Sequence, residues 1–113
     1  MIFELEIPPT LNHTYRVGRG GVFYKDAKAS VWMRYAVLTT QSHHKAIQTI
    51  TGPCYVGIIM ILKRDRDIDS SLKMSLDALQ KAGVMKNDSQ IVHLNVKKEK
   101  GEIPKMIIEV QAL

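Results

Sequence analysis

The chain has 113 residues, of which 45% are hydrophobic and 24% charged; these ordinary values exclude a disordered or low-complexity chain, and the length predicts a single domain over residues 1–113. Sixteen lysines and arginines against eleven acids give a net charge of +5, which favours a polyanionic partner. The longest apolar run is too short to cross a bilayer, the acidic start is unlike a signal peptide, and the single cysteine, Cys54, cannot form an internal disulfide, so we expect a reduced protein in the cytoplasm, outside any membrane.

The chain begins with extended segments. Ile2–Ile7 alternates apolar and acidic residues, which predicts a half-buried strand, and Pro8-Pro9 ends it. Tyr15–Val17 and Val22–Tyr24 flank the sequence Gly-Arg-Gly-Gly at residues 18–21. Because glycine adopts positive φ without strain, this sequence predicts the turn of a β-hairpin.

A long helix and a buried strand follow. Asp26 is suited to cap a helix that runs to about Gln48, before Thr51-Gly52-Pro53 stops it. Tyr55–Leu62 is continuously apolar and rich in β-branched residues. A segment of this kind is typical of a central strand, so we expect both of its faces to be covered.

Helical spacing returns over residues 70–82. One helical face carries three leucines, Leu72, Leu76 and Leu79. Asp69 or Ser70 can cap the start of this helix, and Gly83 is placed to end it with a positive φ.

Two extended segments close the chain. Ile91–Val96 predicts a strand with Val92, Leu94 and Val96 on one face, Lys97–Pro104 predicts a basic turn, and Met106–Val110 predicts the last strand. The element order is therefore β-ββ-α-β-α-ββ. Its strand–helix–strand step predicts a right-handed parallel crossover, followed by an antiparallel hairpin. The expected fold class is α/β, in the mixed α+β sense of a mixed sheet with two main helices packed on it.

Aspartates cluster where the central strand ends. Asp65, Asp67 and Asp69 alternate along an extended chain, so their side chains point to one side, about 7 Å apart at the backbone. Carboxylates in this arrangement can converge on a hard divalent cation, and α/β sheets usually place their sites at this end of a strand. The alternative is a solvated strand end whose acids pair with nearby basic residues.

Two further charged residues follow this cluster. Lys73 lies one helical turn after Asp69, and Asp88 precedes the next strand. If that strand is parallel to the central one, Asp88 stands at the wrong end of the sheet to meet Asp67 and Asp69. Asp88 must then reach the site over the helix, or the strand order must differ from the simplest arrangement.

The spacing of these residues resembles a known family. It reads Asp67-Ile-Asp69-x-x-Leu72-Lys73-x-x-x-Asp77-Ala78-Leu79-x-Lys81-Ala82-Gly83-Val84-x-x-x-Asp88-x-Gln90-Ile91. Together with Pro8-Pro9-Thr10-x-Asn12 and Tyr15-Arg16 near the start, and Lys100-Gly101-Glu102 near the end, it is similar to the RusA family of Holliday junction resolvases. These are small endodeoxyribonucleases of phages and prophages, and the resemblance covers nearly the whole chain.

The resemblance implies an activity and a site. The family's metal-binding acids fall on Asp67, Asp69 and Asp88, and its catalytic lysine falls on Lys73. Three carboxylates suit Mg²⁺, with Mn²⁺ as a substitute. The implied reaction is a pair of nicks across a four-way DNA junction in recombination and repair, in the cytoplasm of a bacterial or phage-infected cell.

Two positions depart from the family pattern. The family usually has asparagine after the second aspartate, where this chain has Ser70, and often has two acids in the last loop, where this chain has Asn87-Asp88. Ser70 still offers a capping oxygen, while the single acid favours a weaker metal affinity. Asp65 has no counterpart in the family motif, so we interpret it as a surface acid paired with neighbouring arginines. We interpret Asp77 as an ion-pair partner of nearby lysines.

The expected partners are branched DNA and a second copy of the chain. Six basic residues are candidates for the phosphate backbone: Arg16, Arg19, Lys25, Lys63, Arg64 and Arg66. A third basic patch comprises Lys97, Lys98, Lys100 and Lys105. Paired nicks in a two-fold symmetric junction predict a homodimer, whose interface is either apolar surface of the first helix (Val31, Trp32, Tyr35 and Leu38) or an edge strand.

Two other hypotheses remain open from the sequence. One is a catalytically inactive DNA-binding protein of the same fold, which the presence of Asp67, Asp69, Lys73 and Asp88 argues against. The other is a metal nuclease that acts on other branched or flapped DNA. A preferred cut-site sequence is not readable, because no base-reading motif is present.

Overall fold

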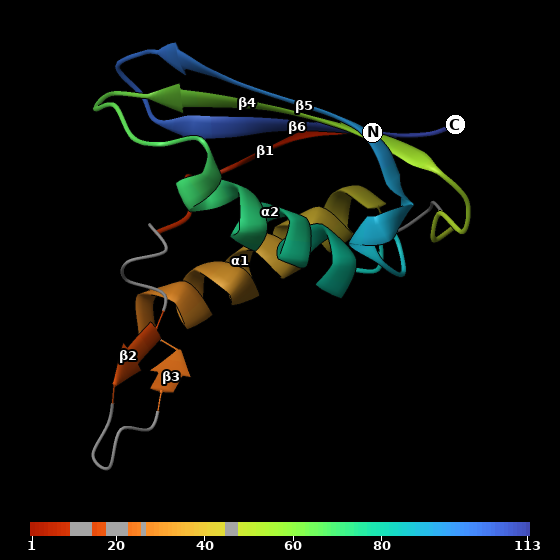
Figure 1. Ribbon diagram of the computed structural model, residues 1–113, viewed down its shortest axis with the longest axis horizontal. Coiled ribbons are helices and arrows are strands. Elements are labelled where there is room, and N and C mark those ends of the chain that lie inside the picture. Colours follow the sequence, from red (N-terminus) through yellow and green to blue (C-terminus); the bar gives the residue numbers. More distant parts are fainter. Residues whose placement is uncertain (10–14, 18–22, 26, 45–47) are drawn as a thin grey trace.

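The computed structural model describes residues 1–9, 15–17, 23–25, 27–44 and 48–113. Its strands and helices follow the predicted order (Figure 1). They are β1 (Ile2–Leu5), β2 (Tyr15–Val17), β3 (Phe23–Lys25), α1 (Ala27–His44), β4 (Cys54–Leu62), α2 (Asp69–Lys81), the short 3₁₀ helix η3 (Asp88–Gln90), β5 (Ile91–Lys100) and β6 (Lys105–Ala112). No helix within these ranges is long and apolar enough to cross a membrane.

Part of the predicted first half lies outside the described residues, namely the Gly-Arg-Gly-Gly turn and the Asp26 cap. The expected hairpin pairing is confirmed, because β2 and β3 are antiparallel. The helix is shorter than predicted: α1 ends at His44, and Gln48 is no longer helical. The chain has to extend by then because the Ile50 N–H donates to the Val84 carbonyl (2.9 Å).

Among the described residues, helices cover the main sheet on one face only. Both α1 and α2 lie on the same side of the sheet, as Figure 1 shows. Along β4, fully buried residues alternate with half-buried ones, so the expectation that both of its faces are covered is wrong. A chain of this size supplies a single helical layer, and the other face of β4 stays open even though its residues are apolar.

The strand order is β1-β6-β4-β5. The predicted parallel crossover is confirmed, because β4 and β5 are parallel on either side of α2. The predicted final hairpin is wrong: β6 pairs antiparallel with β4 and with β1, not with β5. The chain crosses the end of β4 at Gly101, whose N–H donates to the Leu62 carbonyl (3.0 Å). A Cβ at Gly101 would lie 2.5 Å from Cγ2 of Ile61, so this crossing favours glycine.

Strand β5 is longer than the sequence pattern indicates. It continues to Lys100, where a basic turn was predicted from Lys97 onward. The reason is tertiary: β5 pairs along the whole of β4, as far as Leu62 with Lys100. The ladder extends the strand through lysines that carry no strand signal of their own.

Helix α2 meets the sheet through mostly small residues. Its buried positions are Ser71, Met74, Ser75, Ala78 and Leu79. The Ser75 hydroxyl donates to the Ser71 carbonyl (2.8 Å) and lies 3.4 Å from Met106 Sδ, which places α2 against β6. Of the three leucines predicted to share one helical face, only Leu79 is fully buried, and Leu72 and Leu76 are half-buried. Small side chains let the helix approach the sheet closely, so these leucines lie on the flank.

The ends of α2 differ from each other. The cap position is Ile68, whose backbone is already helical and which makes no capping hydrogen bond, so the predicted cap by Asp69 or Ser70 is wrong. At the other end Gly83 has φ of 84°, and its N–H donates to the Gln80 carbonyl (3.1 Å). The predicted glycine terminus is therefore confirmed.

Replacing Gly83 by alanine is expected to destabilise the fold by about 1 kcal/mol, because an L-residue is strained at this φ. Gly52→Ala is the matched control, since Gly52 has open space around its Cβ position and no positive φ. We expect its stability to be unchanged or slightly raised. Urea unfolding followed by circular dichroism measures both, and equal stabilities for the two variants would contradict the prediction.

Candidate active site

Three of the four predicted catalytic residues gather at the start of α2. Asp67 lies in the segment of residues 63–68 that joins β4 to α2, Asp69 is the first residue of the helix, and Lys73 follows one turn later. All three are exposed. Because the helix start makes no side-chain capping bond, the Asp69 carboxylate is not used as a cap. The carboxylate oxygens of Asp67 and Asp69 suit a hard cation such as Mg²⁺, and Lys73 follows one helical turn after Asp69.

The segment that carries Asp67 is held by Arg66. One guanidinium nitrogen, Nη1, donates to the Pro8 carbonyl after β1 and to the Ser71 hydroxyl in α2, each at 2.7 Å. Burial lowers the pKa of this guanidinium from its ordinary value. This side chain joins the segment to the chain after β1 and to α2, and the contact of Arg66 with DNA stays a prediction.

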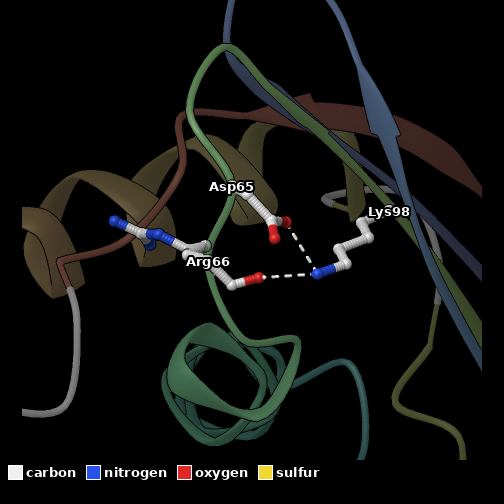
Figure 2. Close-up of polar contacts among 3 residues, drawn as sticks. All are labelled: Asp65, Arg66 and Lys98. Carbon is white, nitrogen blue, oxygen red and sulfur yellow. Dashed lines mark hydrogen bonds and ion pairs between the residues drawn. The ribbon is translucent and has the colours of Figure 1, made fainter.

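Lys98 holds the same segment from the side of β5. Figure 2 shows its ammonium group between the Asp65 carboxylate and the Arg66 carbonyl. The Nζ atom donates to Asp65 Oδ1 at 2.7 Å and to the Arg66 carbonyl at 3.2 Å. The hydrogen bond and the charge of Lys98 keep the pKa of Asp65 below its ordinary value. Asp65 thus pairs with a lysine distant in sequence, and the expected pairing with neighbouring arginines is wrong.

Asp88 is the first residue of η3, in the loop that joins α2 to β5. Asn87 caps η3, its side chain accepting from the Ser89 N–H (2.8 Å), while Gln90 Oε1 accepts from the Asn87 N–H (3.0 Å). The Asp88 N–H donates to Gln80 Oε1 (3.2 Å), which ties the loop to the end of α2. The asparagine that replaces a family acid is therefore the cap of η3. Sequence reasoning missed Gln80 and Gln90, although the Asn87-x-x-Gln90 spacing is a capping-box signal.

Within one chain, Asp88 and the pair Asp67–Asp69 lie at opposite ends of α2. Gln80, the contact of Asp88, is eleven residues after Asp69, which is about 16 Å along the helix axis. The described residues accordingly contain no group of three acids, histidines or cysteines that could hold a metal ion. Of the two arrangements that the sequence left open, neither brings Asp88 to the others within one chain.

The other predicted DNA contacts are spread over the molecule. Arg16 and Lys25 lie on β2 and β3, which Figure 1 shows apart from the main sheet, and Arg19 lies outside the described residues. Lys63 and Arg64 are exposed just before Asp67. The predicted third basic patch is divided between the two faces of the sheet. Two of its members, Lys98 and Lys100, line a cleft of about 350 Å³ together with Lys63 and Asp65.

Comparison with known proteins shows which family the chain belongs to. A profile of the family described as endodeoxyribonuclease RusA matches residues 5–111, a range that includes Asp67, Asp69, Lys73 and Asp88. The crossover junction endodeoxyribonuclease RusA of Aquifex aeolicus (strain VF5) is 35% identical over 105 residues, covering 89% of this chain and 82% of that relative. The chain therefore belongs to the RusA family of endodeoxyribonucleases.

Proposed function

We propose that this chain resolves four-way DNA junctions by paired nicks in recombination and repair, using Mg²⁺ at Asp67, Asp69 and Asp88, in the cytoplasm. The observation that carries the proposal is the exposed group of Asp67, Asp69 and Lys73 at the carboxyl end of β4, in a member of this family. An inactive DNA-binding protein would not need to keep these residues together and open to solvent.

The chemistry follows from the residue types. Asp67 and Asp69 supply oxygen ligands, and Mg²⁺, when bound, neutralises phosphate charge and acidifies a water molecule. Lys73 is a compact point charge one helical turn from Asp69, suited to contact the scissile phosphate. Lys63 and Lys100 lie around the neighbouring cleft, where they would hold the backbone on either side of the cut.

The third ligand requires a second copy of the chain. Two oxygens that bind the same Mg²⁺ lie within about 4.2 Å of each other, because each is about 2.1 Å from the ion. The separation of about 16 Å along α2 exceeds this several-fold. We therefore propose a homodimer in which Asp88 of each chain completes the site begun by Asp67 and Asp69 of the other.

Helix α2 has a flank that suits such a dimer. Asp69, Leu72, Leu76 and Gln80 recur every three or four residues, so they share one side of the helix, and Gln80 holds the Asp88 loop. Lys81, on another side of α2, lines a pocket with residues of α1. The leucine flank thus faces away from α1, and each half of the metal site lies at one of its ends.

Strand β5 extends this apolar flank. Leu94 and Val96 pair with Val56 and Ile58, whose side chains are buried under the helices. Yet Leu94 is 39% exposed, and Val92 at the start of the strand is 65% exposed. The edge strand β5 therefore projects beyond α2. A two-fold axis near Leu76 would bury the leucine flank and β5 while bringing each Asp88 to the opposite Asp67 and Asp69.

Complementation between inactive variants tests the shared site. Asp69→Asn and Asp88→Asn homodimers should each lose cleavage, because both of their sites lack a ligand. A heterodimer of the two variants keeps one intact site, built from Asp67 and Asp69 of one chain and Asp88 of the other. Co-expression with two affinity tags, followed by a nicking assay on a labelled junction, should recover single-strand cuts at about a quarter to a half of the wild-type rate.

The controls are the two variant homodimers, Asp69→Asn and Asp88→Asn, each co-expressed from two copies that carry the two different tags. If the sites lay within single chains, every site of the heterodimer would lack a ligand and no activity would return. Absence of recovery in a purified heterodimer that still binds junctions would therefore contradict the shared site, while leaving the endonuclease activity itself untouched.

Substitution of Val92 tests the interface. Val92→Glu should give a monomer of about 12.8 kDa by light scattering where the wild type gives twice that mass, because a buried unpaired carboxylate opposes dimerisation. Val31→Glu is the matched control, since Val31 on α1 is also a valine 65% exposed. The reverse result, a monomer only with Val31→Glu, would favour the α1 surface instead.

Exchange of the metal tests the reaction. Ca²⁺ should support junction binding without efficient cleavage, since it takes more oxygen ligands at longer distances than Mg²⁺ and does not organise the attack. Gel shift and nicking assays on a four-way junction, a flap and a linear duplex measure binding and cleavage together. Rapid, specific cleavage in Ca²⁺ alone, or equal cleavage of all three substrates, would contradict the proposal.

A further inference from the structure

Asp67 lies in an irregular segment. Residues 63–67 belong to neither a strand nor a helix, so contacts of the segment, rather than a regular ladder or helix, set its position. A metal ligand has to be oriented by its surroundings, and loss of such supporting contacts commonly weakens metal affinity. The question is which residues provide this support.

Arg66 is held at both its side chain and its backbone. Its side chain is held by Pro8 and Ser71, and its carbonyl accepts from Lys98. That carbonyl belongs to the planar peptide group that joins Arg66 to Asp67. Fixing the carbonyl therefore fixes the plane from which the Asp67 side chain departs.

Lys98 suits this role by its geometry. An ammonium group has three donors, and two of them reach the segment: one to Asp65 at 2.7 Å and one to the Arg66 carbonyl at 3.2 Å (Figure 2). Lys98 lies on β5, and the backbone of β5 is fixed by its parallel pairing with β4. The charge-assisted bond to Asp65 keeps the ammonium in place over the backbone bond.

The same contacts contribute little to the stability of the fold. The Asp65 side chain is 82% exposed, and ion pairs in such surroundings are screened by water. The contacts that Lys98 makes are therefore local to the Asp67 segment rather than part of the core.

We propose that Lys98 is a positioning residue for metal binding: by holding Asp65 and the Arg66 carbonyl, it orients Asp67 toward the ion. This inference rests on the proposed metal site. It assigns Lys98 a role different from the phosphate contact expected of a basic surface residue, and it gives Asp65, an acid without a counterpart in the family motif, the role of holding Lys98.

The test replaces Lys98 by methionine, which keeps the apolar stem and removes the ammonium. The Mg²⁺ concentration for half-maximal cleavage should rise about ten-fold or more, the scale typical of lost supporting contacts. Cleavage at saturating Mg²⁺ should stay within about three-fold of wild type, since the reacting groups themselves are unchanged. The increase in melting temperature produced by Mn²⁺ or Mg²⁺ without DNA should shrink in parallel, and this readout is independent of activity.

Three further variants separate this role from its alternatives. Lys98→Arg keeps a cationic donor and should restore most of the metal affinity, and Asp65→Asn should give an intermediate loss. Lys100→Met is the matched control: Lys100 lies on the same face of β5, and its ammonium has no hydrogen bond or ion pair among the described residues. This control should weaken junction binding in Ca²⁺ without changing the requirement for Mg²⁺.

The outcomes are distinct. If Lys98→Met behaves like Lys100→Met, losing junction affinity at an unchanged Mg²⁺ requirement, Lys98 is a phosphate contact and the inference fails. It also fails if the metal response of Lys98→Met equals that of the wild type. A wild-type chain without any response to Mg²⁺ or Mn²⁺, in melting temperature or in cleavage, would overturn the proposed function and this inference together.

Discussion

The unbroken helix α2, thirteen residues long, has Asp69 at its start and the Asp88 loop at its end. A helix of this length is rigid, so α2 keeps Asp69 and the Asp88 loop apart whatever the side chains do. The connection from β4 through α2 to a parallel β5 requires such a crossover, because parallel neighbours cannot be joined by a tight turn. The separation of the acids is thus a consequence of the topology, and it gives a second chain a place in the proposed site.

The apolar surface of the molecule agrees with the proposed site shared between two chains. Leu72 and Leu76 have helical spacing, yet the sheet contacts α2 mainly through serine, alanine and methionine. Leu94 lies on the covered side of the sheet yet is 39% exposed, whereas Val96 on the same side is half-buried against the core. The proposed dimer would bury the apolar surface that Leu72, Leu76 and Leu94 leave outside the core.

The basic residues divide into those that build the site and those left for DNA. Arg66 Nη1 and the Lys98 ammonium both donate to protein atoms, and together they hold the segment before α2 from two sides. Lys63 and Lys100 remain exposed around the neighbouring cleft. A net charge of +5 therefore overstates the charge available to a polyanion, because Arg66 and Lys98 are engaged within the protein.

The sequence by itself determined the order of the elements, the parallel crossover, the glycine end of α2 and the residues of the family motif, because each depends on neighbours close along the chain. Tertiary structure decided the rest. The position of β6 between β1 and β4 depends on how a turn crosses the end of β4, and the length of β5 depends on the strand it pairs with. The partner of Asp65 is 33 residues away, on another strand. The placement of Asp88 relative to Asp67 and Asp69 depends on strand direction and helix length together, and a local pattern of residues contains neither.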